Sequence, residues 1–278
     1  MTITCTPEIL PLEDAPLPAR VYSAGDVHPA TPLVLHLHGG AFVAGSLDNG
    51  RAVSTMLAQA GAIVISADYP LAPGSGFPQT LDRLYRALSH IWGNRGKWAG
   101  KKSPLYVAGE EAGGNLAAGL ALMVRDQRTP SLSGQILLSP MLDPCLATCS
   151  IRSAEAGPVG CRWADGWHQY LGTADKASHP YAAPLGSSRL AGAAPALILT
   201  AEDDPMRDEA VSYAARLRKA GVSARQEILP APTGWPCALA RPDPPAEGWA
   251  IELRDRSSQF FEETASLLCR APPVSSVL

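Results

Sequence analysis

The chain lacks long apolar runs and a strong charge of either sign. Its 278 residues include 23 Lys and Arg against 26 Asp and Glu, a formal net charge of -3. Nucleic acid is therefore an unexpected partner. No stretch approaches the roughly 18 apolar residues of a membrane helix. Residues 1–10 also carry no basic cluster followed by an apolar run. We expect no membrane partner and a cytoplasmic location.

Metal-binding patterns are also missing. The cysteines form no C-x-x-C pair, and no histidine stands at finger-like spacing from them. The sequence therefore predicts reduced, mostly packed thiols, with no metal and no cofactor. The six cysteines are Cys5, Cys145, Cys149, Cys161, Cys237 and Cys269.

What the chain does contain is typical of a packed globular protein, with 46% hydrophobic and 18% charged residues. Short apolar runs alternate with helical patterns, which predicts an α/β fold with a mostly parallel sheet and helices on both faces. We expect one domain over residues 1–278. Strands are predicted at 33–37, 62–67, 105–108, 135–138, 196–200 and 225–229. Helices are predicted at 51–60, 81–92, 114–125, 207–220 and 260–269, and an irregular loop at 230–245.

A glycine-containing motif follows the first predicted strand. The sequence His38-Gly39-Gly40-Ala41-Phe42 can turn backbone N–H groups toward a substrate oxygen, because glycine permits the close approach and unusual dihedral angles that this requires. The motif indicates an oxyanion hole. Taken alone, an ordinary glycine turn is the alternative.

Five further motifs follow in order, and together they carry a resemblance. They are DYPLAP at 68–73, GEEAGGNLA at 109–117, PYAAPL at 180–185, DPMRDE at 204–209 and PTGW at 232–235. Over residues 33–235 the chain resembles the hormone-sensitive-lipase family of esterases, whose motifs read HGGGx, DYxLAPE, GDSAGG, DPLRDE and PHGF. The resemblance implies an α/β-hydrolase fold.

The same resemblance assigns residues to the site. It places the oxyanion hole at Gly39 and Gly40, with the Ala112 N–H as a third donor, and the triad acid at Asp204. An alternative for Asp204 is to cap the helix that begins near Met206. About thirty residues precede the first motif strand, so the N-terminal cap should be reduced, with a cap-like segment at about 145–180. We expect the pocket to be lined by His38, Phe42, Glu110, Thr233, Trp235 and His168, although for Glu110 we favour the alternative of bonding to the backbone behind the pocket.

Two positions depart from the family pattern. Glu111 stands where the family has its nucleophilic serine, and Thr233 where it has its general-base histidine. Acyl transfer by this architecture needs a hydroxyl activated by an imidazole. The departure therefore predicts a protein that is not an ordinary serine esterase.

Three functions remain open on the sequence. The first, which we favour, is a non-esterase enzyme of natural-product biosynthesis. It would use Glu111 with Asp204 as acid and base in a lyase, isomerase or cyclase step. The second is a catalytically dead pseudo-esterase that binds or scaffolds. The third is a hydrolase with Glu111 as a carboxylate nucleophile, as in epoxide hydrolases. The expected ligand is a small apolar carbonyl-containing molecule, and a homodimer is an open alternative to a monomer.

Overall fold

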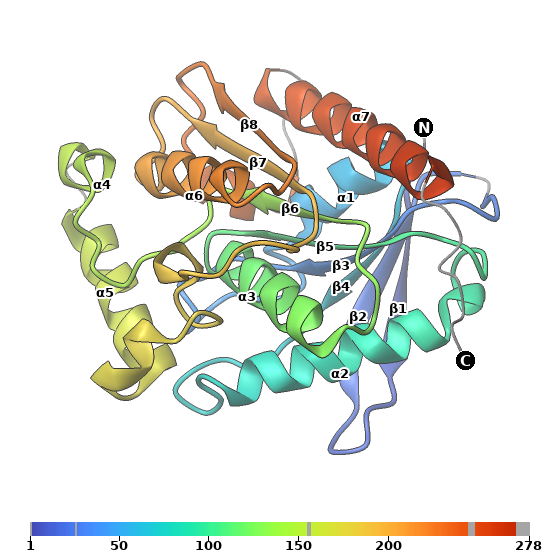
Figure 1. Cartoon of the computed structure of the whole chain (residues 1–278), viewed down its shortest axis with the longest axis horizontal. Coiled ribbons are helices and arrows are strands. Elements are labelled where there is room, and N and C mark those ends of the chain that lie inside the picture. The colour runs from blue at the N-terminus through green and yellow to red at the C-terminus, as the bar shows by residue number, and fades with distance from the viewer. Residues whose placement is uncertain (1, 26, 155–156, 244–247, 271–278) are drawn as a thin grey trace.

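The computed structural model describes residues 2–25, 27–154, 157–243 and 248–270. In this part of the chain one sheet has eight strands in the order β1-β2-β4-β3-β5-β6-β7-β8 (Figure 1). β1 and β2 pair antiparallel, β2 pairs antiparallel with β4, and the pairs from β4 to β8 are parallel. The strands are β1 Thr4–Leu10, β2 Leu17–Ser23, β3 Leu33–Leu37, β4 Ile63–Ala67, β5 Leu105–Glu110, β6 Gly134–Leu138, β7 Ala196–Ala201 and β8 Ala224–Leu229.

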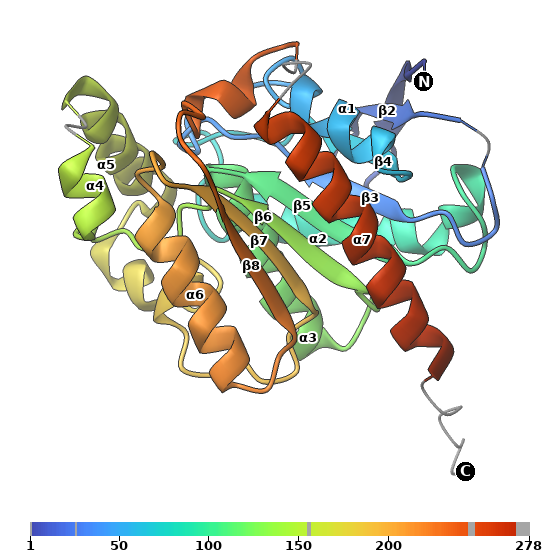
Figure 2. The same ribbon diagram turned by 90° about the horizontal axis from the view of Figure 1, so that it is seen from above.

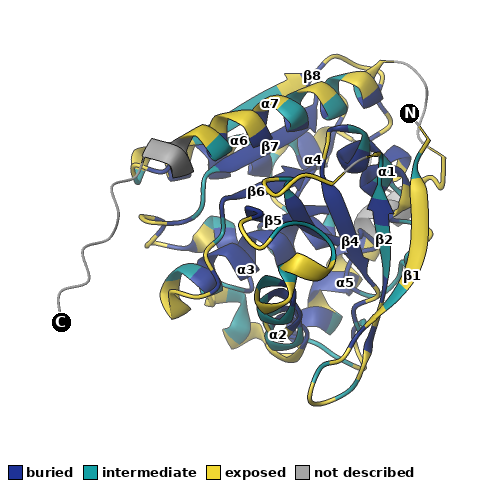
Figure 3. Cartoon of the chain, turned by 90° about the vertical axis from the view of Figure 1, so that its right-hand side faces the viewer, coloured by how far each residue is buried: buried dark blue, intermediate teal, exposed yellow. Residues whose placement is uncertain are grey.

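Helices cover both faces of this sheet, as the alternating pattern predicts. Side chains of α1 and α7 share one core with Val34, whereas those of α2, α3 and α6 share the other with Leu33 and Leu35. Successive residues of a strand point to opposite faces, so both faces of β3 are buried. Figure 2 shows α7 lying over the sheet and running roughly along the strands, and Figure 3 shows the buried centre of the sheet. The helices are α1 Arg51–Gln59, α2 Gln79–Gly93, α3 Ala112–Gln127, α6 Arg207–Lys219 and α7 Trp249–Arg270.

The predicted α/β-hydrolase fold is confirmed, and its six predicted strands are β3 to β8. The prediction missed β1 and β2, which occupy the segment before the first motif strand. β1 lies at the sheet edge, and most of its side chains are exposed. Such a strand has little apolar periodicity to detect. The last helix begins at Trp249, eleven residues before the predicted start at 260. Its first turns were missed because they are rich in charged residues, which hide the apolar periodicity of a helix.

Two α-helices lie in the described part of the predicted cap-like segment of residues 145–180. They are α4 Cys149–Ser153 and α5 Gly157–Leu171, and Figure 1 shows them beyond one end of the sheet. The predicted irregular loop contains a short 3-10 helix, Cys237–Ala240, and its residues 244–247 lie outside the described part. None of the described helices is both long and apolar enough to cross a membrane.

Candidate active site

Glu111 occupies a strained turn between β5 and α3. Its backbone has φ 52° and ψ −116°, a conformation that non-glycine residues rarely adopt. The Glu111 N–H donates to the Leu138 carbonyl at 3.1 Å, and its own carbonyl accepts from the Met141 N–H at 3.1 Å. A Cβ at Gly113 would collide with the Leu37 carbonyl, so this glycine permits α3 to start close to β3. A tight turn from strand to helix presents its central side chain at the end of the sheet.

Three N–H groups hold the Glu111 carboxylate. Its Oε2 accepts from the Gly40 N–H at 2.5 Å and the Ala41 N–H at 3.2 Å, both in the loop after β3. Its Oε1 accepts from the Trp163 indole N–H of α5 at 2.6 Å. A Cβ at Gly39 would lie only 2.9 Å from Oε2, so glycine lets the carboxylate approach the loop. The carboxylate therefore occupies a site that binds an oxygen atom carrying negative charge.

The donor pair in the loop differs from the expected one. The resemblance implies Gly39 and Gly40, but the Gly39 N–H donates to Glu110 Oε1 at 3.0 Å. Gly40 and Ala41 instead point their N–H groups at a common oxygen. The sequence analysis did not predict Ala41 as a donor. The available signal was its place as the third small residue in a row after His38. Ala112 is the first residue of α3, so its N–H has no intrahelical acceptor.

Glu110 lies behind the turn in a buried polar network. It is 1% exposed, and its Oε2 lies 2.7 Å from His36 Nε2. His36 Nδ1 lies 3.1 Å from the hydroxyls of both Ser54 and Ser66. Through its bonds to Gly39 and His36, the Glu110 carboxylate ties the end of β5 to β3 and the loop that follows it. The structure thus places Glu110 beneath the predicted pocket rather than in its lining.

Asp204 is anchored at the ends of β6 and β7. Its Oδ1 accepts from the Ser139 hydroxyl at 2.7 Å and the Met206 N–H at 2.9 Å, and its Oδ2 accepts from the Thr200 hydroxyl at 2.6 Å. Burial raises the pKa of Asp204, against the opposing effect of the Thr200 and Ser139 hydrogen bonds. The N-cap of α6 is Met206, and no described side chain caps this helix, so Asp204 holds the turn before α6 rather than capping the helix. Among the described residues it has no hydrogen bond to Glu111 or Thr233.

Asp203 binds Thr233. The Thr233 N–H and hydroxyl each donate to Asp203 at 2.7 Å, and the Gly234 N–H donates at 2.8 Å. Burial alone would raise the pKa of Asp203, but the hydrogen bonds from Gly234 and Thr233 outweigh it and lower the pKa. Sequence reasoning missed Asp203 because the family motif begins at the following aspartate. The two adjacent aspartates thus bind different neighbours, and among the described residues Thr233 is hydrogen-bonded to Asp203 and not to Asp204.

The predicted pocket residues near the glycine loop are packed aromatic rings. The His38 ring stacks on Tyr69 at 4.4 Å, and its Nδ1 lies 2.7 Å from the Gly39 carbonyl oxygen. Burial lowers the pKa of His38, which favours the neutral ring. Phe42 stacks on Tyr170 of α5 at 4.1 Å. Both side chains therefore support the loop from within.

The last two predicted pocket residues, Trp235 and His168, are not among the residues that line the cavity at Glu111. The Trp235 ring is buried and meets Trp249 edge-on at 5.5 Å, which attaches the loop after β8 to α7. His168 is exposed on α5. The structure therefore brings Glu111 together with Gly40, Ala41 and Trp163, and it leaves His168 and Trp235 outside this group.

A cavity of about 390 Å³ opens at Glu111, beside Gly40, Arg162 and Cys237. This volume lies in the range of small-molecule sites. In open α/β sheets, ligands bind outside the carboxyl ends of the parallel strands, which is where Glu111 lies. In the described part of the chain, no cluster of three or more His, Cys, Asp or Glu could hold a metal ion.

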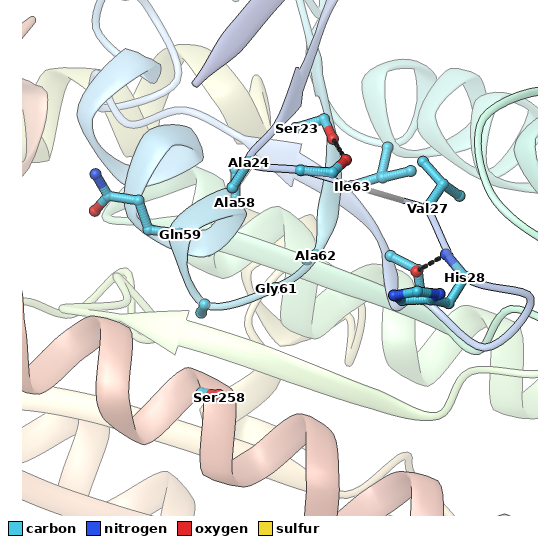
Figure 4. A pocket seen from close by; sticks show the side chains of 13 residues that line it. Ser23, Ala24, Val27, His28, Ala58, Gln59, Gly61, Ala62, Ile63 and Ser258 are labelled. Atoms are coloured by element: carbon cyan, nitrogen blue, oxygen red, sulfur yellow. Dashed lines mark hydrogen bonds between the residues drawn. The ribbon is translucent and has the colours of Figure 1, made fainter. Parts of the chain in front are cut away.

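A second cavity, of about 470 Å³, lies at the opposite ends of β3 and β4 (Figure 4). Its polar groups bond locally: Ser23 Oγ to the Gly25 carbonyl at 3.3 Å and the His28 N–H to Thr31 Oγ1 at 2.8 Å. It lies at the amino ends of the parallel strands, where such sheets rarely bind ligands. The cavity at Glu111 is therefore the candidate active site.

Comparisons with known proteins identify similar esterases. Residues 34–231 match a sequence model of the alpha/beta hydrolase fold family. The chain is 36% identical over 213 residues to the carboxylesterase NlhH of Mycobacterium tuberculosis, covering 74% of this chain and 67% of that protein. It is 33% identical over 215 residues to an arylesterase of Saccharolobus solfataricus, covering 76% and 70%. The solved structure of a hyperthermophilic esterase from Pyrobaculum calidifontis superposes with a TM-score of 0.80 at 32% identity, covering 95% and 86%.

These relatives contradict the function predicted from the sequence. They are named carboxylesterase, arylesterase and esterase, so they indicate esterase activity. A lyase, isomerase or cyclase using Glu111 with Asp204 was the wrong expectation, and so were the dead scaffold and the epoxide-hydrolase-like enzyme. The prediction gave two substituted positions more weight than the similarity of the whole chain. The predicted partnership of Glu111 and Asp204 also has no support in the contacts of the Asp204 carboxylate.

The family assignment rests on agreement between the sequence comparison and the structural superposition. The sequence model covers most of the parallel sheet, and the superposition extends over nearly the whole chain. The strained turn after β5 lies where this fold presents its reactive side chain. The chain belongs to the alpha/beta hydrolase family.

Proposed function

We propose that this chain hydrolyses small carboxylic esters at the cavity beside Glu111. The observation that carries the proposal is the convergence of the Gly40 and Ala41 N–H groups on one oxygen atom. An ester carbonyl oxygen at that point would receive both hydrogen bonds. Such bonds strengthen as the carbonyl oxygen gains charge in the transition state. The esterase names of the relatives support the same reaction class.

We further propose that Glu111 and Thr233 replace the serine and histidine of the family's triad. The support is the motif register, in which Glu111 falls on the turn after β5 and Thr233 on the loop after β8. With no serine hydroxyl at the turn, hydrolysis would proceed by direct attack of water rather than through an acyl-enzyme. Glu111 would be the general base for that water.

The proposed reaction balances with water as the only co-reactant. The ester carbonyl takes the Gly40 and Ala41 N–H groups, and Glu111 Oε2 turns to a water molecule. The water oxygen bonds to the carbonyl carbon as its proton passes to Glu111. The carbon–alkoxide bond then breaks, and the same proton passes from Glu111 to the leaving oxygen. In this proposal Asp204 supports the ends of β6 and β7 and transfers no proton.

The size of the cavity supports a substrate with short chains. Its volume of about 390 Å³ lies near the lower end of the range for small-molecule sites. Its lining beside Glu111 includes Ala44, Pro236 and Ala240, which would pack against an apolar acyl or alcohol group. We therefore propose esters of short acyl chains as the substrate class.

The test is hydrolysis of p-nitrophenyl acetate and butyrate by the full chain. We expect a rate above that of buffer, and a fall of about a hundredfold in Glu111→Gln, the usual scale for loss of a general base. Glu13→Gln is the matched control, because Glu13 is exposed and outside the cavity. A folded wild-type protein with no hydrolysis would overturn the proposal. Inactivation by a serine-directed fluorophosphonate would overturn the proposed replacement of the triad.

A further inference from the structure

The Trp163 indole N–H donates to Glu111 Oε1 at 2.6 Å, and the Trp163 ring is 2% exposed. From this contact we infer that Trp163 is a positioning residue for the Glu111 carboxylate. The inference rests on the proposed function. It adds a role for α5, which lies outside the sequence motifs that follow the strands. A hydrogen bond to a carboxylate is among the stronger polar contacts in proteins, and this one is partly shielded from solvent.

The two oxygens of Glu111 are held by different parts of the fold. Oε2 binds the loop after β3 through Gly40 and Ala41, whereas Oε1 binds α5 through Trp163. When an ester carbonyl takes the loop N–H groups, Oε2 loses both of its donors. The bond from Trp163 to Oε1 is then the contact that keeps the carboxylate oriented. The carboxylate can turn Oε2 toward water while Oε1 stays on the indole.

The position of this donor is set by close packing of α5 on the loop. A Cβ at Gly166 would collide with the Ala41 carbonyl, so the helix backbone touches the loop directly. The Phe42 ring of the loop contacts two rings of α5, with centroid distances of 4.1 Å to Tyr170 and 4.9 Å to Trp167. Because α5 and the loop pack as one unit, the distance between the Trp163 donor and the loop donors changes little.

The same helix offers a matched control. Trp167 is also 2% exposed and lies one turn after Trp163, but its indole N–H has no hydrogen-bond partner in the described part of the chain. Replacing either ring with phenylalanine removes an indole N–H and comparable packing volume. Only the Trp163 substitution removes a hydrogen bond to Glu111.

The kinetic test compares Trp163→Phe with Trp167→Phe in ester hydrolysis. We expect kcat to fall by about tenfold or more in Trp163→Phe with KM within about twofold, since a bond to a charged group is lost. Trp167→Phe trims packing against Phe42 but removes no hydrogen bond to Glu111, so its loss of kcat should be several-fold smaller than that of Trp163→Phe. In the Glu111→Gln background, Trp163→Phe should have little further effect. Equal losses in the two single variants, or an undiminished loss in that background, would overturn the inference.

A second measurement does not depend on hydrolysis or on the folding of the Trp163 variant. In protein labelled with ¹⁵N at the indoles, Glu111→Ala should move the Trp163 Nε1–H resonance and leave that of Trp167 near its place. An unmoved Trp163 resonance would overturn the inference even in an active esterase. A moved resonance in a protein that hydrolyses no ester would confirm the contact and overturn the proposed function instead.

Discussion

The two ends of the parallel sheet differ in how the backbone is held. At the carboxyl ends, the segments after β3, β5 and β6 contain non-glycine residues with left-handed φ values: Ala41, Phe42, Glu111 and Ser139. At the amino ends, the cavity of Figure 4 has its left-handed residue at Gly61, where a Cβ would meet nothing within 4 Å. The carboxyl ends store strain at these residues, whereas the cavity of Figure 4 has glycine at its left-handed position and avoids this strain.

Left-handed conformations of non-glycine residues cost roughly 1–3 kcal/mol each, so neighbouring contacts must maintain them. At the carboxyl ends these contacts are charged or buried hydrogen bonds, such as those from Gly39 to Glu110 and from Ser139 to Asp204. At the amino ends the corresponding bonds lie in exposed turns, such as that from the His28 N–H to Thr31. The difference fits the choice of the cavity at Glu111, rather than that of Figure 4, as the candidate active site.

The largest expected difference comes from placing alanine at a left-handed glycine of each end. Gly40→Ala should lower ester hydrolysis by about a hundredfold or more, because its Cβ would collide with the Ala44 carbonyl and displace an oxyanion donor. Gly61→Ala should cost about 1–2 kcal/mol of stability and leave the specific activity unchanged. Initial rates and urea titrations of both variants provide the measurement. Similar losses of activity at the two ends would remove the distinction.

The next largest effect is expected on stability, from removal of the buried Glu110 carboxyl group. Glu110→Ala should lower the free energy of unfolding by about 3 kcal/mol, since it leaves His36 and the Gly39 N–H without their buried partner. For comparison, Asp48→Asn removes an exposed partner of Arg20 and should cost less than about 1 kcal/mol. Urea unfolding at pH 7 measures both. Equal costs would mean that the Glu110 network adds nothing beyond a surface pair.

A pH dependence of stability should also come from a buried carboxyl group near the carboxyl ends of the parallel strands. Burial raises the pKa of Glu209 to about 8, against its hydrogen bonds from the Leu142 and Asp143 N–H groups in the loop after β6. The folded-state pKa is then above the unfolded value. The contribution to stability is therefore complete below pH 4.5 and is lost as the pH rises to about 8.

The effect of Glu209 is measured by urea unfolding at several pH values. We expect a loss of about 3 kcal/mol between pH 5 and pH 8 in wild type, since each unit of pKa difference corresponds to about 1.4 kcal/mol. Glu209→Gln should show less than half of this change, with Asp204 contributing in the same direction because its pKa is also raised by burial. An unchanged slope in Glu209→Gln would show that Glu209 is not the source.

The smallest effect is expected in the cavity of Figure 4. Ser23→Ala removes a local hydrogen bond to the Gly25 carbonyl and should change the free energy of unfolding by less than about 0.5 kcal/mol. Ester hydrolysis should be the same as in wild type. A clear loss of hydrolysis in Ser23→Ala would mean that the amino end contributes to function after all.

The sequence by itself determined the parallel core of the fold and the turn that carries Glu111. Buried strands such as β3 and β4 read as short apolar runs, and glycines mark the places where loop and helix approach closely. Periodicity could not detect β1, because most of its side chains face solvent. These local signals sufficed because each depends on a few consecutive residues.

Only the tertiary structure decided which groups meet at the turn. Ala41 and Trp163 lie 70 and 52 residues from Glu111 in the chain, yet both bind its carboxylate. The structure also divided the roles of Asp203 and Asp204, which neighbouring positions in a motif do not distinguish. A hydrogen bond between distant segments forms only when the donor–acceptor distance is correct to within a few tenths of an ångström. That geometry arises when α5 and the loop after β3 pack together, so no local pattern contains it.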